Sequence, residues 1–210
     1  MIRRLRAWFS APAADAAGAD FVSGPAEDLA VLRERLSSLE ADPYLSVADT
    51  DLNLISVFDD LKYDRSDADV MSIAMRRYAF KKLNDLGFRQ TSGTVLTHGQ
   101  FDCRVVVPKF HALGASPFDI TRYTPKRTQD YYLLTPTQTA CRFVDLYPHA
   151  DAVERVKMLI SKHPINIYRM MDYLDHSGAH REFLNAIGHL KNVQRQAIKD
   201  DPLCRRRALG

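Results

Sequence analysis

This chain of 210 residues has few of the features that identify common protein classes. No apolar run approaches the roughly 18 residues that a membrane-spanning helix needs, and the longest aliphatic run is Val105-Val106-Val107. We therefore expect no transmembrane segment. Cysteine occurs three times, at widely spaced positions and without a C-x-x-C pair. This usage argues against a disulfide framework and predicts a reducing, cytoplasmic location.

Glycine-rich and histidine-based signatures of catalysis are also missing. The sequence contains no G-x-G-x-x-G, no G-x-x-x-x-G-K-[ST], no G-x-S-x-G and no H-E-x-x-H. The common loops that cradle phosphates, the nucleophile elbow of hydrolases and the zinc-protease helix are therefore not indicated. We expect no cofactor and no resident metal.

The charges that are present form two opposed blocks. Residues 26–70 hold twelve Asp or Glu against four Lys or Arg, whereas residues 71–130 hold ten basic residues against four acidic ones, so the net charge of +3 hides the contrast. Such blocks either dock on each other within one fold or leave the basic block free for an anionic partner. The charge pattern alone does not choose between these outcomes.

Periodicity predicts an α+β protein. Leucines with helical spacing mark a first helix that ends near Asp42-Pro43, and Ser66 with Asp69 forms a capping box for a helix at about 67–86 that stops at Gly87. Residues at about 88–134 alternate and contain turn signals, which predicts a small antiparallel sheet with a long loop at 110–130. Thr135-Pro136-Thr137-Gln138 predicts a helix start, and later Pro and Gly breaks divide a C-terminal bundle at about 136–200 into four helices.

The predicted organisation is one domain with two tails. Residues 26–200 form a single α+β domain with a potential sub-boundary near 135, preceded by a basic, Ala-rich flexible tail at 1–25 and followed by a basic tail at 201–210. Residues 1–10 combine arginines with Trp8 and Phe9, which allows weak contact with a membrane surface. They lack the apolar core of a secretory signal, so export is not expected.

Four residue groups are candidates for function, each with a structural alternative. The first is the leucine seam, which packs either on the protein's own core or on a partner or second copy. Its members are Leu29, Leu32, Leu36 and Leu39.

The second group is basic and lies near Tyr123, Tyr131 and Tyr132, a mixture suited to single-stranded nucleic acid. A solvated face, or pairing with the acidic block, explains the same residues. The group comprises Arg76, Arg77, Lys81, Lys82, Arg122, Lys126 and Arg127.

The third group is a helix pair at 165–174 and 179–190 whose short Gly turn suits a helix-turn-helix, with Arg181 and Asn185 as base readers. Plain bundle packing is the alternative.

The fourth group is Cys103 with His98 and His111, which could form a thiol–imidazole pair or lie in the core. The spacing of Asp172, His176 and His180 invites a metal site, but a Ser-Gly break separates the two histidines and we do not assign one.

These observations predict a non-catalytic cytoplasmic binding or adaptor protein that acts through protein–protein contacts or self-association. The first alternative is a nucleic-acid-binding protein that uses the basic block at 76–127 or the helix pair at 165–190. The second alternative is an enzyme of undetermined class with a Cys/His site.

Overall fold

The computed structural model describes residues 26–58, 71–107, 129–175 and 180–200 of the chain. Within these ranges the elements follow the order α1, η1, β1, β2, α2, β3, β4, β5, β6, then α3 to α7. Both predicted tails, the loop residues 108–128 and the proposed cap Ser66 lie outside the described residues.

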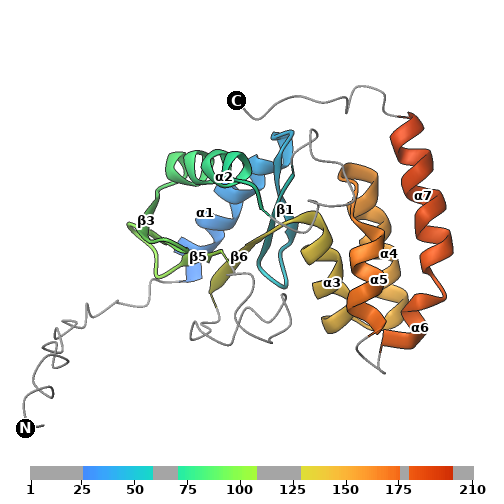
Figure 1. The fold of residues 1–210 in the computed structure, drawn as a ribbon. Helices are drawn as coiled ribbons and strands as arrows, with labels where there is room; N and C mark the ends of the chain where they lie inside the picture. Colours follow the sequence, from blue (N-terminus) through green and yellow to red (C-terminus); the bar gives the residue numbers. More distant parts are fainter. Residues whose placement is uncertain (1–25, 59–70, 108–128, 176–179, 201–210) are drawn as a thin grey trace, which may run out of the picture.

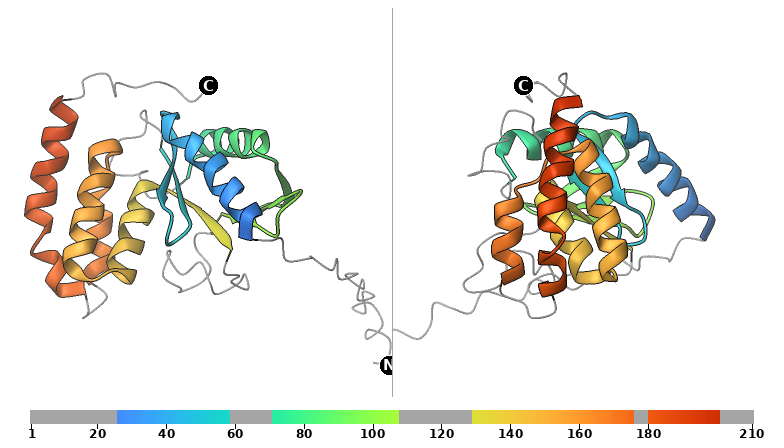
Figure 2. Two further views of the ribbon diagram at one scale, coloured as in Figure 1. Left: turned by 180° about the vertical axis from the view of Figure 1, so that it is seen from behind. Right: turned by 90° about the vertical axis from the view of Figure 1, so that its right-hand side faces the viewer.

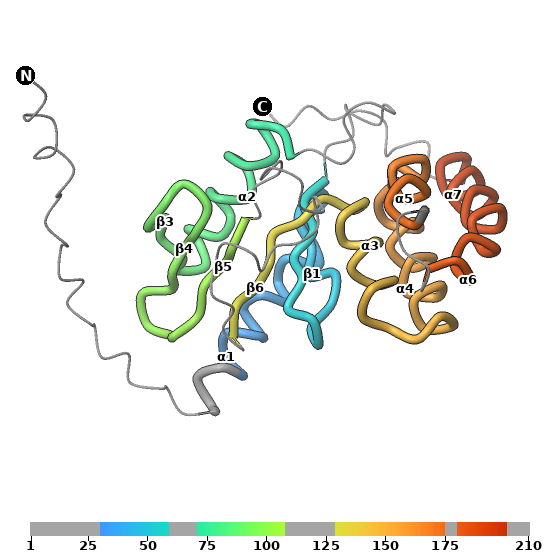
Figure 3. The backbone as a smooth tube through the Cα atoms, turned by 60° about the horizontal axis from the view of Figure 1, so that its bottom comes forward, coloured from blue at the N-terminus to red at the C-terminus, as the bar shows by residue number. Residues whose placement is uncertain are grey.

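Six strands form one mixed sheet in the order β1-β2-β6-β5-β4-β3 (Figure 3). The outer pairs are antiparallel, whereas β2–β6 and β6–β5 are parallel. The strand bounds are Leu45–Asp49, Leu54–Val57, Phe88–Ser92, Val95–His98, Arg104–Val106 and Asp130–Leu134 for β1 to β6. The sheet is therefore larger than the predicted one, because a hairpin of β1 and β2 extends it.

Alternating residues of β6 join the sheet to two separate cores. Tyr131 and Leu133 pack with α1 (Ala26–Ser37), the short 3-10 helix η1 (Ser38–Ala41) and α2 (Ile73–Asp85) on one face. Tyr132 and Leu134 pack with the helical bundle on the other face. The period of two in an extended chain sends neighbouring side chains to opposite faces. The result is three layers, with the sheet between α1/α2 and the bundle (Figures 1 and 2).

The bundle contains five helices in the described ranges, one more than predicted. They are α3 Pro136–Leu146, α4 His149–Lys162, α5 Ile167–Asp175, α6 Arg181–Leu184 and α7 Ile187–Asp200. The start of α3 is confirmed, with Thr135 as cap, Pro136 at the first position and Gln138 completing a capping box. The extra break separates α6 from α7 at Asn185, and the nearest glycine, Gly188, lies inside the first turn of α7 rather than at the break.

Helix α2 begins later than the sequence predicted. Ser72, rather than Ser66, caps it and accepts a hydrogen bond from the Met75 amide at 3.1 Å. The predicted stop is confirmed, because Gly87 adopts a φ of +98° that residues with a side chain rarely adopt. A Cβ there would also lie 2.5 Å from Nε2 of His98, so this glycine permits the close approach of the histidine.

Candidate functional site

Cys103 and His98 are buried on the side of the sheet that α1 and α2 cover. They form hydrogen bonds with other groups and not with each other. Burial raises the pKa of the Cys103 thiol to about 12, and its Sγ lies 3.3 Å from the carbonyl oxygen of Gln129. His98 Nδ1 accepts amide hydrogens from Gln100 and Phe101, which places its proton on Nε2, 3.0 Å from the carbonyl oxygen of Leu86. Burial lowers the pKa of His98. The third candidate, His111, lies outside the described residues.

Among the described members of the basic block, two are bonded to other parts of the protein and two are exposed. Lys82 forms an ion pair with Asp42 at 2.9 Å, and Arg76 donates to the carbonyl oxygen of Gly93. Arg77 and Lys81 are exposed on α2. The remaining members, Arg122, Lys126 and Arg127, lie outside the described residues.

The aromatic part of the nucleic-acid interpretation needs a correction. Tyr131 and Tyr132 are only 6% and 5% exposed, because β6 is a central strand with helices on both sides. Their rings fill the two cores and cannot stack on bases from solvent. The third tyrosine, Tyr123, lies outside the described residues.

The helix pair does not have the form of a helix-turn-helix. The predicted second helix is interrupted: Arg181 lies in α6, a helix of four residues, and Asn185 is its C-terminal cap. Both side chains are exposed. A single turn is too short to present several base-reading residues along a groove, so the packing interpretation fits the described geometry.

The leucine seam belongs to the core of the chain itself. Leu32, Leu36 and Leu39 are at most 4% exposed and pack against the sheet with α2. Burying each of them contributes roughly 2 kcal/mol of hydrophobic free energy. The proposal that a partner covers these three side chains is therefore corrected. Leu29 lies in α1, but its side chain falls outside the described part of the structure.

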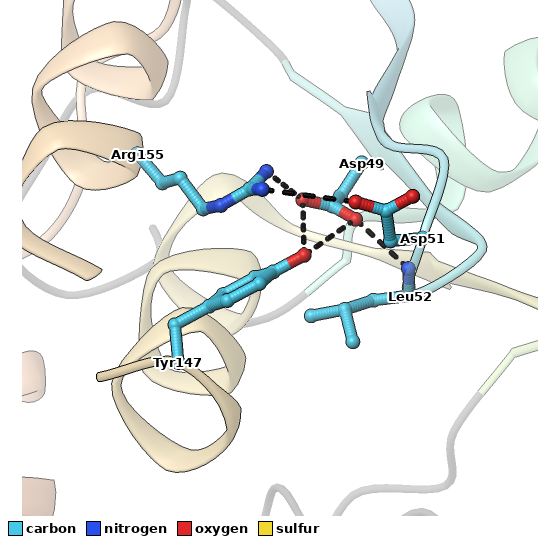
Figure 4. A network of polar contacts seen from close by, with 5 residues as sticks. All are labelled: Asp49, Asp51, Leu52, Tyr147 and Arg155. Atoms are coloured by element: carbon cyan, nitrogen blue, oxygen red, sulfur yellow. Dashed lines mark hydrogen bonds and ion pairs between the residues drawn. The ribbon is translucent and has the colours of Figure 1, made fainter. Parts of the chain in front are cut away.

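The structure assembles a polar network that the sequence analysis did not identify (Figure 4). Asp49, at the end of β1, has a fully buried carboxylate that accepts the Tyr147 hydroxyl at 3.1 and 3.0 Å and the Leu52 amide at 2.8 Å. Arg155 of α4 donates to the same carboxylate, and its guanidinium lies 3.9 Å from the centre of the Tyr147 ring. Exposed Asp51 lies 3.7 Å from Arg155.

This network closes the turn end of the β1–β2 hairpin against the bundle. Burial, with a further contribution from the hydrogen bond to Asp49, raises the pKa of Tyr147 to about 12. Three donors satisfy the Asp49 carboxylate, so it is not available as a general base. The arrangement stabilises the interface and does not resemble a reactive site.

Two further clusters of a carboxylate, a tyrosine and a cationic or imidazole side chain occur among the described residues. Asp42 accepts the Tyr78 hydroxyl at 2.9 and 2.7 Å and pairs with Lys82. In the bundle, the carboxylate of Asp145 accepts the hydroxyl of Tyr173. It also contacts Nε2 of His180 at 3.2 Å and Nη1 of Arg142 at 3.3 Å. Asp42 follows η1 whereas Tyr78 and Lys82 lie in α2. Asp145 lies in α3 whereas Tyr173 lies in α5, so each cluster joins two helical elements.

A different polar group lies at the opposite end of the sheet–bundle interface. Ser46 of β1 and Ser56 of β2 are directly opposite in the antiparallel register, and Nε2 of His163 lies 3.4 Å from Oγ of Ser46. All three side chains are at most 5% exposed. Within the described ranges, Oγ of Ser56 and Nδ1 of His163 have no hydrogen-bond partner. Burial lowers the pKa of His163 to about 4.

One sequence signal could have found both ends of this interface. Tyr147 and His163 each precede a proline and cap the C-terminus of a helix, α3 and α4 respectively. The residue before proline is driven out of the helical region, and both adopt extended backbone angles. Their side chains are thereby directed away from the helix toward the sheet hairpin. The sequence analysis used these positions only as helix breaks.

No metal centre is indicated in the described ranges, where no three His, Cys, Asp or Glu side chains group as ligands. Asp172 pairs with Arg169 at 3.7 Å, and His176 lies outside the described residues. Among the described helices, none is both long and apolar enough to span a membrane. Comparisons of the chain with protein families, with curated proteins and with solved structures found no match.

Proposed function

We propose that this chain is a non-catalytic binding protein, and that the outer face of α2 contacts an acidic, partly apolar segment of a protein partner. The observation that carries the proposal is a stripe of three side chains, Ile73, Arg77 and Lys81, spaced four residues apart. Ile73 is 72% exposed, and the two cations are exposed beside it. An apolar centre with adjacent cations suits a segment that carries both carboxylates and aliphatic side chains.

The chemistry of the other candidates supports a binding role over a catalytic one. A buried thiol whose pKa is raised to about 12 remains protonated at neutral pH and is a poor nucleophile. The Asp49 carboxylate is occupied by its donors. The exposed face of α2, by contrast, carries Arg77 and Lys81, which form no ion pair with another described residue and can be contacted by a partner.

A protein partner is favoured over nucleic acid by the position of the aromatic residues. Binding of single strands combines cations with exposed rings on which bases stack. Tyr131 and Tyr132 are buried, and Phe80 lies beneath the guanidinium of Arg76 at 5.4 Å. The α2 face therefore offers charge and an aliphatic side chain, without a described stacking surface.

The test is a titration of the full chain with two labelled probes, a peptide of alternating Glu and Leu and a single-stranded DNA of the same charge. The Arg77→Glu/Lys81→Glu variant reverses the α2 stripe. The Arg195→Glu/Lys199→Glu variant makes the same charge change, at the same spacing, on exposed residues of α7. We expect salt-sensitive peptide binding that the α2 variant weakens by about tenfold or more, and that the α7 variant retains.

Two results would contradict this proposal. Equal weakening by both variants would mean that net charge, rather than the α2 stripe, attracts the peptide. Tighter binding of the DNA than of the peptide, lost in the α2 variant, would assign the stripe to nucleic acid instead.

A further inference from the structure

Ser46, Ser56 and His163 form a polar group enclosed between the sheet and the bundle. We propose that Ser56 and His163 bind one small uncharged molecule that both donates and accepts hydrogen bonds, that Ser46 orients the imidazole through its contact with Nε2, and that water is the occupant. This inference is independent of the proposed role of α2. It concerns how the hairpin and the bundle are joined at the end opposite to Asp49.

The strand register brings the two serines together. Ser46 and Ser56 are direct partners in the β1–β2 pair, so their side chains lie on one face with Cβ atoms about 4.5–5.5 Å apart. Their neighbours Leu45, Ile55 and Val57 pack in the core on the other face. The serines therefore face the bundle, where His163 reaches them from the end of α4.

The hydrogen-bonding capacity of this group exceeds what the protein supplies. Each hydroxyl has one donor and two acceptor positions, and a neutral imidazole has one of each. The contact between Ser46 and His163, at 3.4 Å, uses one donor and one acceptor. In the described structure, Oγ of Ser56 and Nδ1 of His163 are both buried and unbonded. Buried polar groups are almost always bonded to protein or to ordered water, because an unmet group costs its desolvation energy.

The surroundings determine the charge of the occupant. The ring of Phe58 lies 5.2 Å from that of His163, and the backbone positions facing it on β1 and β2 carry the neutral serines. Lys162 is the charged residue that acts on His163, and it disfavours a second positive charge. No described carboxylate balances a cation here, and an anion would face two hydroxyls and a neutral ring. An uncharged molecule avoids both penalties.

The enclosure determines its size. Ser56 is fully buried, and Ser46 and His163 are each 5% exposed. A larger ligand would have to separate the hairpin from α4, whereas a water molecule needs room for about one probe sphere and two to four polar partners. Oγ of Ser56 and Nδ1 of His163 supply two such partners.

The test compares Ser56→Ala with Ser161→Ala, a control at an exposed α4 serine whose hydroxyl bonds to the Met158 carbonyl. If a water is bonded to Ser56, removal of the Ser56 hydroxyl leaves that water with one partner fewer, and the folding equilibrium constant falls roughly fivefold. If the Ser56 hydroxyl has no partner, removing it raises that constant. The control should change it little.

Oxygen-17 relaxation dispersion of the full chain reads the occupant directly. We expect one long-lived internal water fewer in Ser56→Ala than in the wild type, and the same loss in His163→Phe, which removes Nδ1 and serves where the first variant folds poorly. A count of long-lived waters that both variants leave unchanged would overturn the proposal. So would a more stable Ser56→Ala protein.

Discussion

The two ends of the sheet–bundle interface differ in how their buried polar groups are hydrogen-bonded. At the hairpin turn, a buried carboxylate is matched by a hydroxyl, an amide and a guanidinium, and the network reaches solvent through Arg155 and Asp51. At the opposite end, a neutral histidine and two serines are enclosed and have spare hydrogen-bonding capacity. The comparison teaches that full charge is tolerated where permanent cations and water are near, and that the enclosed end has to stay neutral.

Acidification should separate the two ends most strongly. The pKa of His163 is about 4 in the folded protein against an ordinary value of 6.5, so between these pH values the unfolded chain binds more protons. Stability should therefore fall as the pH is lowered from about 6.5 to about 4, by about 3 kcal/mol in total from this residue. Urea unfolding across this range checks it. His163→Gln should remove this part of the pH dependence, whereas exposed His189→Gln should retain it.

Removal of the carboxylate at the turn end should have the next largest effect. Asp49→Ala leaves Tyr147 and the Leu52 amide without their acceptor, and we expect a loss of about 2–3 kcal/mol in unfolding free energy at neutral pH. Arg155 is partly exposed and can turn to solvent, which limits the loss. Asp51→Ala is the control, expected within about 0.5 kcal/mol because its side chain is 75% exposed. Equal losses in both variants would contradict the closed network.

Loss of the tyrosine hydroxyl should be milder. Tyr147→Phe keeps the ring beneath Arg155 but removes one donor from Asp49, so we expect about 1–2 kcal/mol of destabilisation in chemical denaturation. The same hydroxyl gives a second measurement. The pKa of Tyr147 is raised to about 12, and an NMR titration of Asp49→Asn should move it toward 10, whereas Asp51→Asn should move it less.

Local signals predicted much of the fold. The Thr135-Pro136 start of α3 and the Gly87 stop of α2 depend on neighbouring residues alone, and the structure has both. Strands at 88–92 and 95–98 were indicated by turn residues between alternating segments. These features are encoded within a few residues, so a single sequence suffices to find them.

The missed elements depend on contacts between distant residues. The run from Leu54 to Val57 is buried on both faces because the bundle covers one face of the sheet and α1 and α2 cover the other, so it shows no alternation that would identify a strand. Asp49 becomes a network centre only when Tyr147 and Arg155 approach it from about a hundred residues away. Conversely, the sequence analysis placed Lys82 and Tyr131 on a nucleic-acid-binding surface. In the structure Lys82 pairs with Asp42, and Tyr131 packs in the core.

Residue-resolved amide exchange from pH 7 to pH 4 tests the contrast between the two ends most directly. The reporters are the Phe58 and His163 amides, bonded to Tyr44 and Leu159 carbonyls, and the Leu52 and Tyr147 amides at the turn end. The account predicts that the opening free energies of the Phe58 and His163 amides decrease as the pH is lowered, and that those of the Leu52 and Tyr147 amides decrease less. A parallel decline of all four, or no decline at Phe58 and His163, would contradict it.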